Sequence, residues 1–196
     1  MECILQKSVN PHRFKLVLVM AMFALPVVAS YLAYFVWQPQ GATRNYGTLI
    51  HPEPLPDALT VSALDGLSVS LKALRGKWLL VQTDTAACTA DCEKKLYAMR
   101  QVRLMQGREQ DRILRVWLIT DAQAPRASLQ KKYEGMQLIT DPQHALIKNL
   151  TAEGAVTQYI YMIDPLGNVM MRWPGNPDIK RMFKDIERLL KASQIG

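Results

Sequence analysis

The residues best suited to chemistry are Cys88 and Cys92, which have three residues between them and follow an apolar run. Two thiols this close form a disulfide, act as a redox couple or bind a soft metal ion. If Cys88 lies at or just before the first turn of a helix and Cys92 within it, both share one face. Their Cα atoms are then about 6 Å apart, within the range of disulfides. The same spacing lets two thiolates bind one Cu(I).

The surroundings of the two thiols leave their reactivity open. A helix amino terminus lowers the pKa of a thiol, whereas Asp91 and Glu93 place negative charge beside the sulfurs and oppose this effect. A bridge that closes over three residues gives little loop-entropy stabilisation, which favours a functional dithiol over a structural disulfide. Thiol–disulfide exchange with a partner and transient Cu(I) handling are equal alternatives.

The elements around the cysteines alternate between strand and helix patterns. An apolar run at 78–83 predicts the strand before the cysteines, and apolar residues at helical spacing, Met99 and Met105 among them, predict a helix over 92–106. The other expected elements are strands at 114–120, 138–140, 159–163 and 169–173 and helices at 125–133 and 177–192. This order predicts the α/β class and a thioredoxin-like fold, in which helices flank a central mixed sheet.

An apolar segment precedes this domain. Residues 16–37 carry no charged side chain, and as a helix they span about 33 Å, enough to cross a bilayer. Lys7, Arg13 and Lys15 precede the segment, and the next charge is Arg44, which predicts a cytoplasmic amino terminus. We therefore expect a single-pass protein of the bacterial inner membrane with a periplasmic carboxy-terminal domain. The alternative is a signal peptide cleaved after Ala29.

Four regions follow from these patterns. Residues 1–15 form a cytoplasmic segment, 16–37 the transmembrane anchor, 38–56 a proline-rich linker and 57–196 the thioredoxin-like domain.

Three motifs carry a resemblance to a known family. The segment Leu74-Arg75-Gly76-Lys77-Trp78, the Cys-x-x-x-Cys pair after a strand, and Tyr161-Met162-Ile163-Asp164-Pro165-x-Gly167 resemble the Sco/SenC family of cytochrome oxidase assembly proteins. The resemblance covers residues 57–192 and the single anchor. It implies a membrane-anchored accessory factor that acts on a cytochrome oxidase subunit or another assembly factor, with Cys88 and Cys92 in thiol redox or Cu(I) handling.

The sequence also departs from that family. The family's copper-binding histidine would fall near Val156, yet residues 154–161 contain no histidine. Thr89 and Glu93 stand where the family has prolines after its cysteines, and Gln158 stands near the proline that faces the cysteines of ordinary thioredoxin-like oxidoreductases. Only Cys88 and Cys92 are therefore carried over as metal ligands. The third ligand is unknown, and the remaining histidines outside the amino-terminal segment, His51 and His144, are the other donors.

The formal net charge is +7, and basic residues outnumber acidic ones along and after the cysteine-bearing helix. They are Lys94, Lys95, Arg100, Arg103, Arg108, Arg112 and Arg115. Such a face suits anionic lipid or an acidic partner, or is simply solvated. Nucleic acid is an unsuitable partner on this side of a membrane, and no phosphate loop or hydrolase motif occurs.

Three functional hypotheses remain. The first is the thiol-redox or copper-relay accessory factor. The second is a scaffold within the assembly complex that has lost the metal site and does no chemistry. The third is a general thiol–disulfide oxidoreductase, the one enzyme class that the pattern admits.

Overall fold

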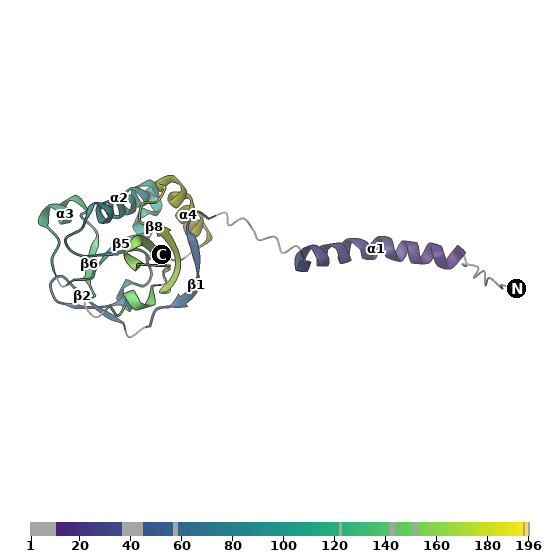
Figure 1. Ribbon diagram of the computed structural model, residues 1–196, viewed down its shortest axis with the longest axis horizontal. Helices are drawn as coiled ribbons and strands as arrows, with labels where there is room; N and C mark the ends of the chain where they lie inside the picture. Colours follow the sequence, from purple (N-terminus) through teal and green to yellow (C-terminus); the bar gives the residue numbers. More distant parts are fainter. Residues whose placement is uncertain are drawn as a thin grey trace. The chain divides into compact units, whose positions relative to one another are not determined.

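The protein is described by a computed structural model that covers residues 11–36, 45–56, 59–121, 123–141, 144–150, 153–193 and 195. It divides into two units, Met1–Arg44 and Asn45–Gly196. In the first unit, helix α1 spans Pro11–Val36 and contains Pro26 (Figure 1). Its part His12–Phe35 is long and apolar enough to cross a membrane. The prediction of an apolar helix of spanning length is confirmed, while its expected last residue, Trp37, lies outside the described residues.

The second unit is built on one mixed sheet. Within the described residues eight strands form it, in the order β1-β8-β7-β4-β5-β6-β2-β3. β4 pairs in parallel with β5, and β5 with β6, whereas the other pairs are antiparallel. The strands are β1 Thr48–Pro54, β2 Thr60–Ala63, β3 Ser68–Ser70, β4 Trp78–Asp84, β5 Ile113–Ile119, β6 Gln137–Thr140, β7 Tyr159–Ile163 and β8 Asn168–Pro174. The central strands β4 and β5 are buried on both faces, which explains their nearly continuous apolar sequences.

Two long helices cover one face of the sheet (Figure 1). Met99 of α2 and Ile186 of α4 pack with Leu80 of β4 in one apolar cluster. Met99 is buried as predicted, but Met105 is 43% exposed, since it ends α2 beyond the edge of that cluster. The helices are α2 Ala90–Met105, α3 Ala127–Lys132 and α4 Ile179–Ala192, and the 3₁₀ turns are η1 Leu71–Leu74, η2 Gly107–Arg112, η3 Ile147–Asn149 and η4 Val156–Gln158.

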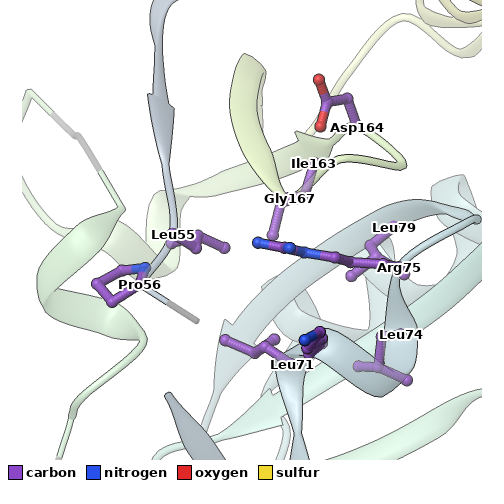
Figure 2. A pocket seen from close by; sticks show the side chains of 10 residues that line it. Leu55, Pro56, Leu71, Leu74, Arg75, Leu79, Ile163, Asp164 and Gly167 are labelled. Atoms are coloured by element: carbon purple, nitrogen blue, oxygen red, sulfur yellow. The ribbon is translucent and has the colours of Figure 1, made fainter. Parts of the chain in front are cut away.

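The opposite face of the sheet packs against η1, η3 and the loops around them. A small pocket there is lined by Leu71 of η1 and Leu79 of β4 (Figure 2). Arg75 extends across this pocket toward Gly167, whose positive φ of 96° lets the chain turn between β7 and β8. Leu79 lies near the start of β4, whereas Cys88 follows the end of that strand, so this pocket is remote from the cysteines.

Strand β1 corrects the predicted linker. Residues Thr48–Pro54 lie at the sheet edge and pair with β8, so the folded unit begins before the expected boundary at residue 57. Proline lacks an N–H group but is tolerated on an edge strand, where only one side needs hydrogen bonds. Pro52 and Pro54 therefore concealed a strand within a segment whose composition is typical of linkers.

Candidate redox site

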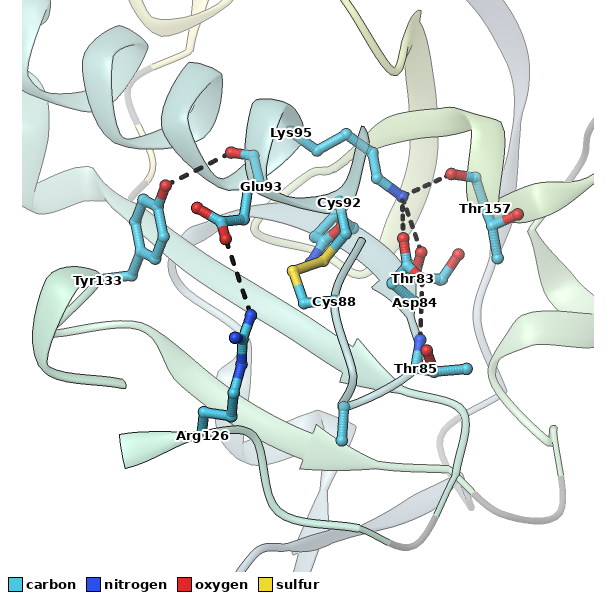
Figure 3. Close-up of a disulfide and its surroundings, with 12 residues drawn as sticks. Thr83, Asp84, Thr85, Cys88, Cys92, Glu93, Lys95, Arg126, Tyr133 and Thr157 are labelled. Carbon is cyan, nitrogen blue, oxygen red and sulfur yellow. Dashed lines mark hydrogen bonds and ion pairs between the residues drawn. A yellow bond between two sulfur atoms is a disulfide. The ribbon is translucent and has the colours of Figure 1, made fainter. Parts of the chain in front are cut away.

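The two cysteines lie where β4 passes into α2. β4 ends at Asp84, α2 begins at Ala90, and the loop between them carries Cys88 with a positive φ of 46°. Cys92 lies in the first turn of α2, and the two residues form a disulfide with Cα atoms 5.1 Å apart (Figure 3). Both thiols are thus brought together at a helix amino terminus, as their spacing predicts. A non-glycine residue with positive φ is uncommon and marks a backbone held by its surroundings.

The disulfide is covered on its inner side by apolar side chains. Cys88 is 3% exposed and Cys92 is fully buried, and both pack in one cluster with Trp117, Leu129 and Tyr133. The residues on either side of Cys88 are exposed, so the bridge lies only one residue below the surface. Cys88 is therefore the more accessible of the two cysteines, although only a small part of it is exposed.

One polar side chain touches the buried sulfur. The Nε2 atom of Gln82 donates to Sγ of Cys92 over 3.7 Å, and Gln82 itself is fully buried in β4. Its Oε1 atom has no hydrogen-bond partner among the described residues. When the disulfide is reduced, an amide side chain can donate to a Cys92 thiolate or accept from a thiol, so Gln82 suits both protonation states of the reduced cysteine.

The acidic residues near the sulfurs are both paired with cations. Asp91 forms an ion pair with Lys94 at 2.8 Å, and this hydrogen bond lowers the pKa of Asp91. Glu93 contacts Lys132 at 2.9 Å and Arg126 at 3.9 Å. The opposition that Asp91 and Glu93 offer to thiolate formation is therefore reduced, although the burial of Cys92 still works against the effect of the helix amino terminus.

Lys95 is a buried cation next to the disulfide, which corrects its expected place on a basic surface. The side chain is 2% exposed, and its ammonium group donates to the carbonyls of Thr83 and Thr157 and to Oδ2 of Asp84 at 3.0 Å (Figure 3). Burial lowers the pKa of Lys95, and the hydrogen bond to Asp84 works against this shift. All three N–H donors are used. Through these hydrogen bonds Lys95 of α2 links the end of β4 to the segment before β7.

A polar cavity of about 540 Å³ opens beside this network. Thr89 from the cysteine loop, Lys95 and Gln158 are among the residues that line it. The segment 156–158 therefore approaches the start of α2, although Val156 itself packs with the cluster on the opposite face of the sheet. A bound chain segment in this cavity would lie next to the loop that carries Cys88.

The three-ligand copper site of the Sco/SenC family does not fit the residues present. Within the described part of the chain, no group of three or more His, Cys, Asp and Glu side chains is close enough to hold a metal ion. His51 lies in edge strand β1, and His144 lies in the turn before η3 with a positive φ of 54°. The two sulfurs alone form a two-coordinate donor set, which suits only Cu(I) among the common biological metal ions.

A family described as "Transmembrane-like, thioredoxin-like, C-terminal domain" matches residues 78–193. The chain belongs to this family. The match begins with β4 and ends after α4, so it includes the cysteine loop and every long helix of the second unit. No curated protein matches the chain.

Solved structures share the fold of this family member. A putative electron transfer protein from Aquifex aeolicus VF5 is 17% identical with a TM-score of 0.56, over 72% of this chain and 94% of that one. A SCO1/SenC family lipoprotein from Bacillus anthracis str. Ames is 19% identical with a TM-score of 0.53, over 72% of this chain and 99% of that one. Arabidopsis thaliana ScoI with copper bound is 13% identical with a TM-score of 0.55, over 76% of this chain and 99% of that one. The predicted thioredoxin-like fold and the likeness to Sco/SenC proteins are confirmed.

The sequence pattern predicts the cysteine pair but not the two polar side chains beside it, Gln82 and Lys95. Gln82 and Lys95 come from buried positions of β4 and α2, and neither belongs to a motif. Lys95 does follow Cys92 by three residues and thus shares its helix face, which was the available signal.

Proposed function

We propose that this protein is a membrane-anchored, Sco-like accessory factor of respiratory oxidase assembly that works by thiol–disulfide exchange through Cys88 and Cys92. The observation that carries the proposal is the closed pair at the amino terminus of α2, with Cys88 in a left-handed conformation just outside the helix. We further propose that α1 crosses the inner membrane with the second unit in the periplasm, where disulfides persist.

The exchange follows from the positions of the two sulfurs. A thiolate of the partner attacks Sγ of Cys88, a mixed disulfide forms, and the electron pair of the broken bond passes to Sγ of Cys92. The helix amino terminus and the Gln82 amide stabilise that thiolate. The second partner thiolate then attacks the mixed disulfide, so the partner gains a disulfide and the pair becomes a dithiol. Two electrons and two protons are transferred, and the reverse sequence reduces a partner.

The test is a redox titration of the full chain in neutral detergent, in glutathione buffers, with the dithiol fraction measured by alkylation. A Cys3→Ser background leaves this pair as the only thiols. An exchange pair is half reduced between about −180 and −300 mV, whereas a structural disulfide stays oxidised to lower potentials. A pair still oxidised below about −300 mV would leave the scaffold as the better hypothesis, and so would normal oxidase assembly with Cys88→Ser/Cys92→Ser.

Transient Cu(I) handling is the second candidate function, and the two adjacent sulfurs favour it. Copper would be cargo of the reduced pair. An anaerobic Cu(I) titration of the reduced full chain against a competing chelator decides this point. We expect one-to-one binding that the double cysteine variant loses if copper is carried, and equal binding by both proteins if it is not.

A further inference from the structure

A third pocket lies on the helical side of the sheet and is lined by cations. It has a volume of about 370 Å³ and lies between α2, β5 and α3. Five of its lining residues are basic and one is acidic: Arg100, Arg103, Arg115, Lys131, Lys132 and Glu134. The pocket shares no lining residue with the cavity beside the disulfide.

Arg115 is the central residue of this pocket. It is only 5% exposed, although it is a charged residue within the buried strand β5, and it shares a strand face with Ile113 and Trp117. Its Nη2 atom donates to the carbonyl of Glu134 at 2.7 Å. Its Nε and Nη1 atoms are buried and have no hydrogen-bond partner among the described residues. Leaving charged donors buried and unpaired is costly, so a negative charge placed close to the guanidinium would stabilise it.

The cations around Arg115 are only partly neutralised. Arg103 is bound by Asp111 at 3.1 Å and by the carbonyl of Ile113, and Lys132 pairs with Glu93. Arg100 and Lys131 are exposed at the pocket and form no ion pair within the described residues. Burial lowers the pKa of Arg115, and repulsion from Arg103 and then Arg100 adds to this shift. The pocket therefore holds more positive charge than its one lining carboxylate, that of Glu134, can neutralise.

We propose that this pocket binds a phosphate-sized oxyanion, either the free ion or the phosphate group of a lipid. Guanidinium groups present N–H donors in a planar fork that matches phosphate oxygens, and hydrogen bonds between two charged groups are the stronger ones. The anion binds among the positively charged side chains that line the pocket, with Arg115 as the buried charge and Arg100 and Lys131 as the exposed ones. Because the volume exceeds that of a bare phosphate, the pocket has room for an attached glycerol moiety.

The first experiment titrates inorganic phosphate into the full chain in neutral detergent at constant ionic strength, by calorimetry. We expect saturable one-to-one binding that Arg115→Gln weakens by about tenfold to a hundredfold. Because Arg115 is buried and its variant can misfold, Arg100→Gln/Lys131→Gln provides a second test from exposed positions, with a loss of about tenfold or more. Lys180→Gln/Lys184→Gln on α4 removes the same net charge elsewhere and should leave binding unchanged.

The second experiment distinguishes the lipid source. The full chain is placed in nanodiscs of phosphatidylcholine, with or without phosphatidylglycerol, and amide hydrogen exchange of 100–104 and 131–135 is compared. Protection that requires phosphatidylglycerol and is lost in Arg100→Gln/Lys131→Gln assigns the site to a lipid headgroup, and phosphate binding without it assigns the site to the free ion. If neither ligand is bound, or if the α4 control weakens binding equally, the proposal is wrong.

Discussion

Replacement of Lys95 by methionine tests whether the hydrogen bonds of the buried ammonium group stabilise the fold around the disulfide. Methionine keeps most of the side-chain volume but removes three donors, leaving the carbonyls of Thr83 and Thr157 and the carboxylate of Asp84 without them. Hydrogen bonds to a charged group contribute about 1.5–3 kcal/mol each, whereas burying an ammonium group costs several kcal/mol. We expect the free energy of unfolding to fall by about 3 kcal/mol, a large part of the 5–15 kcal/mol typical of a domain.

The assay is urea denaturation of the full chain in neutral detergent, followed by tryptophan fluorescence. Lys94→Met is the matched control, because Lys94 is the adjacent residue and its ion pair with Asp91 is exposed to solvent. That control should leave the free energy of unfolding nearly unchanged. Hydrogen exchange should also accelerate in the segment 156–158 of the Lys95→Met variant alone. Equal stability of both variants would refute the reasoning, because the network would then contribute no net stabilisation.

Two further predictions concern buried polar side chains, Asp185 of α4 and Tyr161 of β7. Asp185 is buried and its carboxylate accepts from the backbone N–H groups of Tyr46 and Gly47 and from Nε1 of Trp173, so Asp185→Asn should lower the free energy of unfolding by about 2–4 kcal/mol in urea denaturation. A loss below about 1 kcal/mol would contradict this role. Burial raises the pKa of Tyr161 to about 12, so between pH 10 and pH 12 the unfolded chain loses the phenol proton while the folded chain keeps it. Stability therefore falls as pH rises, by about 1.4 kcal/mol at pH 11. Tyr161→Phe should lack this loss, which denaturation at pH 8 and pH 11 would show, and equal losses in both proteins would contradict it.

Elements with strong periodicity were predictable from the sequence. The apolar runs of β4 and β5 and the hairpin of β7 and β8 were recovered within one or two residues, because central strands and tight turns leave clear patterns. The short strands β2 and β3 were missed, since three or four residues carry no resolvable period. β1 was missed because its prolines are typical of linkers, and only the pairing with β8 reveals it as an edge strand.

The candidate site was predictable in its sulfurs and unpredictable in its surroundings. The four-residue spacing of Cys88 and Cys92 on a helix determines their separation, so local geometry was sufficient. The Gln82 contact to Cys92 depends on where β4 passes beneath α2, which is a tertiary relation that no local pattern encodes. The burial of both sulfurs likewise depends on Trp117 of β5 and on α3, distant elements in the sequence.

Two buried cations on the same face of the sheet illustrate how charge distinguishes structure from binding. Lys95 and Arg115 were both expected on a basic surface, yet both are buried, and a buried charge needs partners. The ammonium of Lys95 has three protein acceptors, which matches its three donors. The guanidinium of Arg115 has five N–H donors and, within the described residues, one protein acceptor, the carbonyl of Glu134. Lys95 therefore has a full set of protein partners, whereas Arg115 keeps unpaired donors within the described residues, which is one basis of the proposed anion site.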